Sequence, residues 1–431
     1  MSMARPRIVI VGAGFAGFSA ARELSRLSGG SADIVIVNPT DYFLYLPLLP
    51  EVATGILEPR RISVSLAAQL PDVRVVLGTV DTFDLAARTV TYTDPDDGRA
   101  TLGYHRLVLA VGSVNKLLPV PGVTEYAHGF RGIPEALYLR DHLTRQIEMA
   151  DVAADDAERT ARTTFVVVGA GYTGTEVAAQ GVLFTNALTR QRAGLAGRVR
   201  WLLLDTADRV LPQLDERLAR ASDRVLRRRG VDVRLSTSVT EATAEGVLLS
   251  DGDFVATRSL IWCVGVRPDP VVDGLHLPMD QGRLVVDEFL TVPGHPDVYA
   301  CGDAAAVPDL TRPGEVTGMT AQHAIRQGIT VARNIAASYG QGRRRAYKHH
   351  DLGFVVDLGG FEAAANPVHV PLSGFPAKVV TRGYHLLQMP GNRVRVAADW
   401  LLGAVLPRQA VQLGLVRAPA VPLEAARSAR S

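Results

Sequence analysis

TFVVVGAGYTGTEVAAQ, at residues 164–180, repeats in outline what RIVIVGAGFAGFSAARE presents at residues 7–23. Each stretch has a short β-branched run without a polar face, then glycines in the pattern G-x-G-x-x-G, then small residues. The apolar run is typical of a buried parallel strand, and the glycines fit a tight turn into a helix. Both stretches are therefore predicted to open βαβ units, whose second strands we expect at residues 34–37 and 201–204.

The glycines of this pattern have separate physical roles. The first permits the tight turn, the second lets the backbone approach a pyrophosphate, and the third allows close contact between helix and strand. The helix N-terminus adds N–H donors and a positive dipole end. One copy could be a purely structural turn, but two copies in the same context predict two bound dinucleotides. The predicted binding residues are Gly12, Gly14, Phe15, Ala16 and Gly17 in the first turn, and Gly169, Gly171, Thr173 and Gly174 in the second.

The residue that ends the second strand of such a unit normally accepts hydrogen bonds from the nucleotide ribose. In the second unit it is Asp205, whose carboxylate suits free ribose hydroxyls and repels a 2′-phosphate. This favours NADH over NADPH, although the positive charge of Arg209 nearby would attract a 2′-phosphate. In the first unit it is Asn38, a neutral residue that either binds the ribose or is only a turn residue before Pro39.

Composition limits the remaining classes. A chain of 431 residues is too long for one simple core, and its net charge of +2 gives no reason to expect nucleic acid. The two cysteines, Cys263 and Cys301, are far apart, so neither a disulfide framework nor a metal site is predicted, and a reducing cytoplasm is favoured. The apolar N-terminal run resembles a signal peptide but is interrupted by glycines at motif spacing. No run is long enough to predict a membrane-spanning helix.

Several motifs together resemble the type II NADH dehydrogenases, single-chain NADH:quinone oxidoreductases among the flavoprotein reductases with two dinucleotide-binding domains. The resemblance covers residues 5–335 well and the remainder loosely. Besides the two glycine turns it rests on LVLAVGS (107–113), WCVGVRP (262–268), VYACGDAAA (298–306) and AQHAIRQG (321–328).

The resemblance implies that the first glycine turn binds FAD and the second binds NADH. Asp303 would bind the ribityl chain of FAD, although it also suits the N-cap of the following helix. Glu176 and Gln322 are the expected catalytic residues, near the nicotinamide and the flavin. Glu176 is equally acceptable as a structural residue in a first helical turn. The further cofactor residues are Gly112, Gly302, Ala321, Gln322 and Lys378 for FAD, and Glu176 and Gly265 for NADH.

Two departures qualify the resemblance. Disulfide reductases of this fold carry a cysteine pair after the first βαβ unit, but TDYFLYLPLLPEVATGILEPRRI (40–62) has none, so electrons must pass from the flavin directly to an acceptor. In AQHAIRQG, Arg326 occupies the position of the second glutamine, which falls one residue later, at Gln327. The identity of the quinone, menaquinone or ubiquinone, is therefore left open.

We predict an α/β fold with two Rossmann-type domains, the first discontinuous. The FAD-binding domain should span 1–118 and 283–340, the NADH-binding domain 119–282, and a C-terminal region 341–431. Residues 374–416 mix apolar clusters with arginines, and Pro390 and Pro407 exclude one long helix. This indicates peripheral attachment to the cytoplasmic side of the cell membrane. The alternatives are a contact between two copies in a homodimer and a structural cover over a domain.

The expected reaction is hydride transfer from NADH to FAD, then two-electron reduction of a membrane quinone without proton pumping. Two other functions remain open. One is a soluble reductase of the ferredoxin or rubredoxin type, and the other is a redox sensor that binds NADH and FAD but turns over slowly.

Overall fold

The computed structural model describes residues 5–408 and 411–423, and these form two compact units. Unit 1 comprises the described residues of Met1–Leu44, Ser63–Val114 and Val266–His350. Unit 2 comprises those of Tyr45–Ile62, Asn115–Gly265 and Asp351–Ser431. The chain therefore crosses between the units more often than the sequence suggested. The main differences from the expected boundaries are that residues 45–62 belong to unit 2 and that unit 2 also includes the C-terminal region from residue 351 onward.

Unit 1 is built on a six-stranded sheet of order β22-β23-β9-β1-β2-β5. Val9 on the central strand pairs with Val35 on one side and with Leu107 on the other, in parallel register, and all three side chains are fully buried. Burial on both faces explains the continuous apolar run. The strands are β22 (Thr291–Val292), β23 (His295–Ala300), β9 (Arg106–Leu109), β1 (Arg7–Val11), β2 (Asp33–Asn38) and β5 (Arg74–Leu77).

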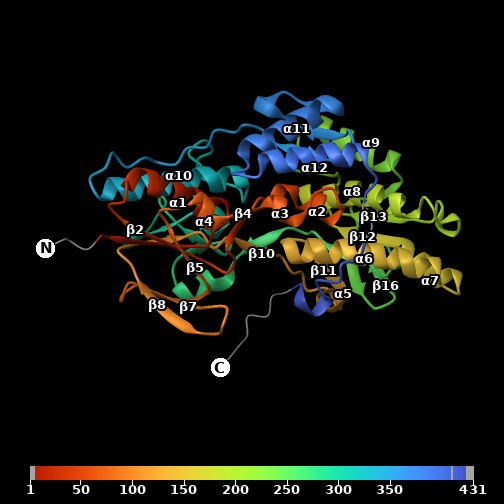
Figure 1. The fold of residues 1–431 in the computed structure, drawn as a ribbon, viewed down its shortest axis with the longest axis horizontal. Helices are drawn as coiled ribbons and strands as arrows, with labels where there is room; N and C mark the ends of the chain where they lie inside the picture. Colours follow the sequence, from red (N-terminus) through yellow and green to blue (C-terminus); the bar gives the residue numbers. More distant parts are fainter. Residues whose placement is uncertain (1–4, 409–410, 424–431) are drawn as a thin grey trace. The chain divides into compact units, whose positions relative to one another are not determined.

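Two helices of unit 1, α1 (Phe15–Ser28) and α10 (Ala321–Ser338), run side by side (Figure 1). They approach so closely that a Cβ at Gly328 would lie 2.1 Å from the carbonyl oxygen of Ala16. The smaller elements are α4 (Leu66–Gln69), η3 (Pro270–Leu275), η4 (Gly302–Ala304), and the strands β3 (Tyr42–Leu44), β4 (Ser63–Ser65), β6 (Thr79–Asp84), β7 (Thr89–Thr93), β8 (Arg99–Gly103), β19 (Val266–Pro268), β20 (Met279–Asp280), β21 (Arg283–Val285) and β24 (Ala305–Ala306); β10 (Ser113–Asn115) lies where the chain passes from unit 1 to unit 2.

Unit 2 has a second parallel sheet, of order β11-β18-β12-β13-β14. In its core Trp201 stacks on Phe165 at a centroid distance of 4.9 Å, and its ring would lie 2.3 Å from a Cβ at Gly181, so this helical position requires glycine. The elements are β11 (Ala127–Gly129), β18 (Leu260–Trp262), β12 (Thr164–Val168), β13 (Arg200–Leu204), β14 (Val231–Arg234), β15 (Val239–Ala242), β16 (Gly246–Leu249), β17 (Phe254–Ala256), η1 (Leu46–Leu48), α2 (Leu49–Ala53), α3 (Pro59–Ile62), α5 (Val123–Tyr126), α6 (Ile133–Asp151), α7 (Asp156–Thr163), α8 (Tyr172–Thr189), η2 (Ala193–Leu195) and α9 (Glu216–Arg228).

The stretch 149–162 is rich in alanine and charged residues, a composition typical of a solvated connector, but it is mostly helical. Helix α6 extends to Asp151, and α7 begins at Asp156 after a short break. The Asp155 carboxylate caps α7 by accepting the N–H of Glu158 at 2.8 Å, and Glu158 pairs with Arg162 one turn later. Capping and an i,i+4 ion pair thus stabilise a helix that alanine content and charge alone did not identify.

In the C-terminal region, residues 341–350 belong to unit 1 and the described residues from 351 onward to unit 2, so the region is not a third body. The residues from 351 onward form a small sheet that packs against α11, and α12 packs against α11 and α3. Helix α11 ends just before Pro390 and α12 just before Pro407, so two short helices replace one long helix, as predicted. No helix among the described residues has the length and apolar character needed to cross a membrane. The elements are β25 (Val355–Asp357), β26 (Ala363–Ala365), η5 (Pro367–His369), β27 (Leu372–Ser373), α11 (Phe375–Gln388), α12 (Arg393–Val405) and η6 (Ala418–Ala420).

Candidate functional site

The first glycine turn lies in unit 1, between β1 and α1. Gly12 has φ of +95°, and a Cβ there would lie 2.4 Å from the carbonyl oxygen of Ala110. A Cβ at Gly17 would lie 1.9 Å from the carbonyl oxygen of Gly12. Around Gly14, by contrast, no other atom lies within 4 Å of the Cβ position. The turn is therefore packed tightly on the protein side and open at the glycine expected to face a pyrophosphate.

The second glycine turn, between β12 and α8 in unit 2, has the same geometry. Gly169 has φ of +103°, and its Cβ would lie 2.2 Å from the carbonyl oxygen of Cys263. A Cβ at Gly174 would lie 1.8 Å from the carbonyl oxygen of Gly169, and the space at Gly171 is open within 4 Å. Thr173 is exposed on the first turn of α8. The two glycine turns, here called glycine cradles, thus share a first glycine with positive φ, a third glycine in close contact with backbone, and open space at the second glycine.

The two residues expected at the ribose positions are also equivalent in the structure. The side-chain oxygen of Asn38 accepts the N–H of Ala13 at 2.8 Å, and a carboxylate oxygen of Asp205 accepts the N–H of Ala170 at 2.5 Å. The Asn38 amide nitrogen donates to the Thr40 carbonyl oxygen at 2.8 Å. Both side chains therefore brace their glycine turns. Their contacts with ribose remain predictions.

A second loop of unit 1 holds Asp303. Gly302 has φ of +70° and donates its N–H to the side-chain oxygen of Gln327 at 2.8 Å. The Gln327 amide nitrogen donates to Thr317 Oγ1 at 2.9 Å, and the Asp303 carboxylate accepts the Ser113 hydroxyl at 2.6 Å. Gln327 is fully buried, so the displaced second glutamine of AQHAIRQG fixes the Asp303 loop from inside.

The remaining predicted FAD residues of unit 1 lie on backbone that can approach a ligand. Gly112 has φ of +78° with open space at its Cβ position. Ala321 and Gln322 are partly exposed in the first turn of α10, where the Thr320 hydroxyl accepts the N–H of His323 at 3.3 Å. Phe15, at the start of α1, packs edge-on against Phe43 at 5.1 Å.

Unit 2 brings together Glu176 and Lys378, two predicted residues separated by 202 positions in the chain. Asp357 connects them. Its carboxylate oxygens lie 2.5 and 2.6 Å from Lys378 Nζ, and its backbone N–H donates to Glu176 Oε1 at 2.8 Å. Asp357 also accepts the N–H of Gly359, whose carbonyl oxygen is bound by Arg229 at 2.9 Å. Lys378 and Asp357 are almost completely buried, so the pair is desolvated.

The electrostatics of Glu176 follow from this position. Burial raises the pKa of the Glu176 carboxyl well above its usual range, and the neighbouring Asp357 and Glu51 carboxylates add to the effect. The hydrogen bond from the Asp357 N–H and the charge of Lys378 oppose it. A carboxyl with a raised pKa can hold a proton near neutral pH, which suits proton delivery to an acceptor.

Sequence reasoning missed Asp357. No motif marks it, because its partners come from α8 and α11, and only the DLGG turn after β25 hinted at a fixed backbone.

Gly265, a predicted NADH residue, has φ of +103° and open space at its Cβ position.

The two cysteines are both free, and burial raises the pKa of each thiol to about 12. Neither is therefore suited to thiolate chemistry at neutral pH. Among the described residues, no group of His, Cys, Asp and Glu is arranged to hold a metal ion.

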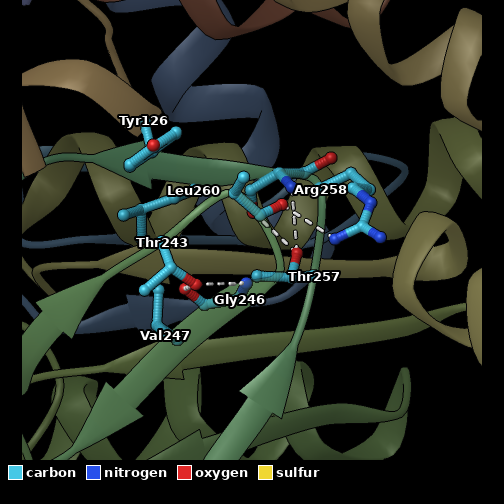
Figure 2. A pocket seen from close by; sticks show the side chains of 9 residues that line it. Tyr126, Thr243, Gly246, Val247, Thr257, Arg258 and Leu260 are labelled. Atoms are coloured by element: carbon cyan, nitrogen blue, oxygen red, sulfur yellow. Dashed lines mark hydrogen bonds between the residues drawn. The ribbon is translucent and has the colours of Figure 1, made fainter. Parts of the chain in front are cut away.

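The cavity drawn in Figure 2 is not a nucleotide site. It lies beside β15–β17 of unit 2 and has a volume of about 80 Å³. Its polar groups already bind one another, since Thr257 Oγ1 accepts the N–H of Ser259 at 2.9 Å and Thr243 Oγ1 accepts that of Gly246 at 3.3 Å (Figure 2). A drug-sized ligand needs several times this volume.

These features define a class of protein. Two equivalent glycine cradles, each opening a helix of its own parallel sheet, fit two dinucleotides, and the loop of Gly302 and Asp303 fits the polyol of a flavin. The class is that of the flavoprotein reductases with two dinucleotide-binding domains. In agreement, residues 6–328 match the family model of the pyridine nucleotide-disulphide oxidoreductases.

Curated relatives narrow the class. The chain is 33% identical to the type II NADH:quinone oxidoreductase NdhA of Mycobacterium tuberculosis, over 93% of this chain and 87% of the relative. It is 30% identical to the demethylphylloquinone reductase NdbB of Synechocystis, over 93% and 97%. The chain therefore belongs to the pyridine nucleotide-disulphide oxidoreductases and, within them, to the type II NADH:quinone oxidoreductases.

The fold agrees with this assignment. The structure of NDH2 from Plasmodium falciparum in complex with NADH superposes with a TM-score of 0.87, covering 94% of this chain and 100% of that one, at 16% identity. A ferredoxin reductase from Rhodopseudomonas palustris superposes with a TM-score of 0.68, covering 95% and 98%, at 19% identity. At these identities the likeness concerns the fold.

Proposed function

We propose that the chain oxidises NADH and passes its electrons through FAD to a membrane quinone, without pumping protons. The observation that carries this proposal is the pair of equivalent glycine cradles, one in each unit, in a chain without a cysteine pair for disulfide chemistry. When bound, FAD supplies the two-electron redox chemistry that links the NADH and quinone half-reactions.

The two glycine cradles are assigned to the two cofactors. The cradle of Gly12, Gly14 and Gly17 would hold the FAD diphosphate, with Asp303 on the polyol. The cradle of Gly169, Gly171 and Gly174 would hold NADH. These assignments are supported by the open space at Gly14 and Gly171 and by the N-terminal ends of α1 and α8.

In unit 2, Glu176 and Lys378 are assigned to the acceptor side, and in unit 1, Ala321 and Gln322 are assigned to the flavin ring. Reduction of a quinone to a quinol takes up two protons, so a carboxyl that holds a proton and a lysine that donates hydrogen bonds suit this side. Menaquinone and ubiquinone share the carbonyl groups that such residues would bind.

We further propose that unit 2 attaches to the cytoplasmic surface of the membrane through its C-terminal helices. Helix α12 exposes Val394, Leu401, Leu402 and Val405, with exposed fractions of 83, 68, 54 and 75%. A stretch of apolar side chains facing water favours burial at a lipid headgroup boundary. A homodimer contact would use the same face.

The arginines of this region contribute less than the sequence suggested. Arg393 donates to the Met389 carbonyl oxygen at 2.8 Å, Arg408 is half-buried against Thr54, and Arg382 lies over Trp400. Arg395 and Arg417 are exposed. Apolar contact, with a smaller electrostatic part, is therefore the expected source of membrane affinity.

The test is an assay of the purified holoprotein with NADH against a quinone, a ferredoxin and oxygen, with and without anionic liposomes. We expect quinone to be reduced fastest, with liposomes raising the rate for a long-chain quinone only. Faster reduction of ferredoxin, with no effect of liposomes, would favour a soluble electron-carrier reductase. Slow turnover with every acceptor would favour a redox sensor.

A further inference from the structure

Glu51, on α2 of unit 2, is a second buried carboxyl that the sequence did not single out. Its exposed fraction is 1%. Carboxyl Oε2 accepts the indole N–H of Trp400 from α12. Oε1 has no hydrogen-bond partner among the residues that the structure describes. An ionised carboxylate would leave that oxygen unsatisfied in an apolar interior, at considerable cost.

The nearest cation does not remove this cost. Arg382 approaches Oε1 to 3.6 Å, beyond hydrogen-bond distance, and its guanidinium carbon lies 4.1 Å from the centroid of the Trp400 ring. Its position therefore suits the indole face better than the carboxyl. The Trp400 N–H identifies Oε2 as the acceptor oxygen, which leaves Oε1 as the oxygen that carries a hydroxyl proton.

Charged groups reach Glu51 from several elements. Asp357 on β25 and Glu176 on α8 are acidic, whereas Lys378 and Arg382 on α11 and Arg408 after α12 are basic. Burial is the main cause that raises the pKa of Glu51, and Asp357 adds to it. Arg382, Lys378 and the Trp400 N–H act in the opposite direction.

Glu51 also interacts electrostatically with Asp357, Lys378 and Glu176, the polar cluster around the acceptor residues. On the same segment, Thr54 Oγ1 lies 3.4 Å from the side-chain oxygen of Gln180, whose nitrogen donates to the Asp357 carbonyl oxygen at 3.2 Å. Asp357 in turn holds Lys378 and Glu176. Two protonatable carboxyls, Glu51 and Glu176, thus both interact electrostatically with one buried ion pair.

We propose that Glu51 is a proton-storing residue of the acceptor half-reaction, held as a neutral acid at rest. The inference depends on quinone reduction as the proposed function. NADH, one proton and quinone give NAD⁺ and quinol, so each turnover draws one proton from water. Glu51 releases its Oε1 proton toward the acceptor by way of the Lys378–Asp357 pair, and water restores it. Arg382 and the Trp400 N–H then stabilise the transient carboxylate.

The direct test is infrared spectroscopy of the holoprotein near neutral pH. Wild type should show a protonated-carboxyl C=O stretch that is lost in Glu51→Gln and retained in Glu58→Gln, a matched change at a side chain that is 58% exposed. Trp400→Phe should keep the band but move it to higher frequency, because a hydrogen bond to Oε2 is lost. Loss of no band in Glu51→Gln would overturn the proposal, whatever the natural acceptor.

The kinetic test compares two acceptors. Ferricyanide takes electrons without protons, whereas quinone needs both. Glutamine preserves the shape of Glu51 and the acceptor for Trp400, so Glu51→Gln should keep its FAD and its ferricyanide rate. Its quinone rate should fall on the order of 100-fold or more, since general acid catalysis typically contributes about 10²- to 10⁴-fold. The decline of the quinone rate at high pH should also change. Equal losses with both acceptors would mean a structural role and would overturn the proposal.

Discussion

Asp205 is the residue on which we expect the choice between NADH and NADPH to depend. Asn38 holds its own glycine turn with the same hydrogen bond but without a charge. Asp205→Asn should therefore keep the hydrogen bond from the Ala170 N–H, lose the one that the Ala207 N–H donates to the other oxygen, and remove the repulsion of a 2′-phosphate. We expect the NADH-to-NADPH ratio of kcat/KM to fall on the order of tenfold, equivalent to about 1.4 kcal/mol. Equal kcat/KM for the two nucleotides in wild type would contradict the role of this carboxylate.

Gly14 and Gly171 offer a matched pair of substitutions. Their φ values of −69° and −71° suit any residue, and the space at each Cβ position is open. Valine at either position should thus leave the fold intact and obstruct only the diphosphate. Gly14→Val should purify without flavin colour, whereas Gly171→Val should keep FAD and lose NADH affinity. A full flavin spectrum in Gly14→Val would refute the assignment of FAD to unit 1.

The buried pair of Asp357 and Lys378 supports a stability prediction. Asp357→Ala should leave a buried ammonium without its partner and cost about 3–5 kcal/mol of unfolding free energy. The double variant Asp357→Ala with Lys378→Met should recover much of this loss, because no unpaired charge remains. Denaturant titration of the three proteins measures both effects. If the double variant is no more stable than Asp357→Ala, the unpaired charge of Lys378 is not the cause of the lost unfolding free energy.

At the scale of elements, the sequence predicted both βαβ units to within one or two residues, because glycine spacing and apolar runs are local signals. The role of Asp303 was predicted from the resemblance to the type II NADH dehydrogenases. The Glu176–Asp357–Lys378 cluster was only half foreseen. It depends on a hairpin, β25–β26, that brings distant segments together, and no local pattern encodes such a contact. The helical character of residues 156–163 was missed because its cap is a single aspartate.

Helix α12 presents the clearest prediction at this scale. Trp400 and Val396 fix its inner face, so Leu401 and Val405 on its exposed side can change without loss of packing. Leu401→Asp with Val405→Asp should lower binding to anionic liposomes about tenfold or more, since each buried leucine or valine contributes roughly 1.5–3 kcal/mol. Sedimentation with liposomes measures this.

The matched control for α12 is Phe254→Asp, which removes an exposed apolar side chain from β17 elsewhere in unit 2 and should leave liposome binding unchanged. Unaltered liposome binding in the α12 variant, with a change from dimer to monomer, would instead assign this face to a second copy. Deleting the chain from Gly374 onward is a poorer experiment, because it would also remove Lys378 from Asp357.

For the whole molecule, four buried histidines predict sensitivity to acid. Burial lowers the pKa of His128, His323 and His385 to about 4 and that of His142 well below its usual range. Between pH 6.5 and 4 the unfolded chain therefore binds protons that the folded chain does not. Stability should rise with pH across this window, by up to about 1.4 kcal/mol per pH unit for each histidine.

Three of these histidines lie in unit 2 and one in unit 1, so unit 2 should unfold first on acidification. Glu51 and Glu176 have the opposite effect on the pH dependence of stability. Because their pKa values are raised in the folded state, their contribution to stability is present at low pH and is lost as pH rises. Urea titrations at several pH values would measure the balance. A midpoint that does not change from pH 4 to 7 would contradict the neutral state of the histidines.

The excursion of residues 45–62 has a consequence for synthesis on the ribosome. These residues leave the tunnel early, but the elements they pack against, α6, α8, α11 and α12, are made much later. The apolar segment is therefore completely buried only after about 350 further residues have been translated, at about 5–20 residues per second. Unit 1 is also unfinished until residue 350 emerges. Both units thus reach completion only late in translation, and part of the apolar surface of the nascent chain stays exposed to water until then.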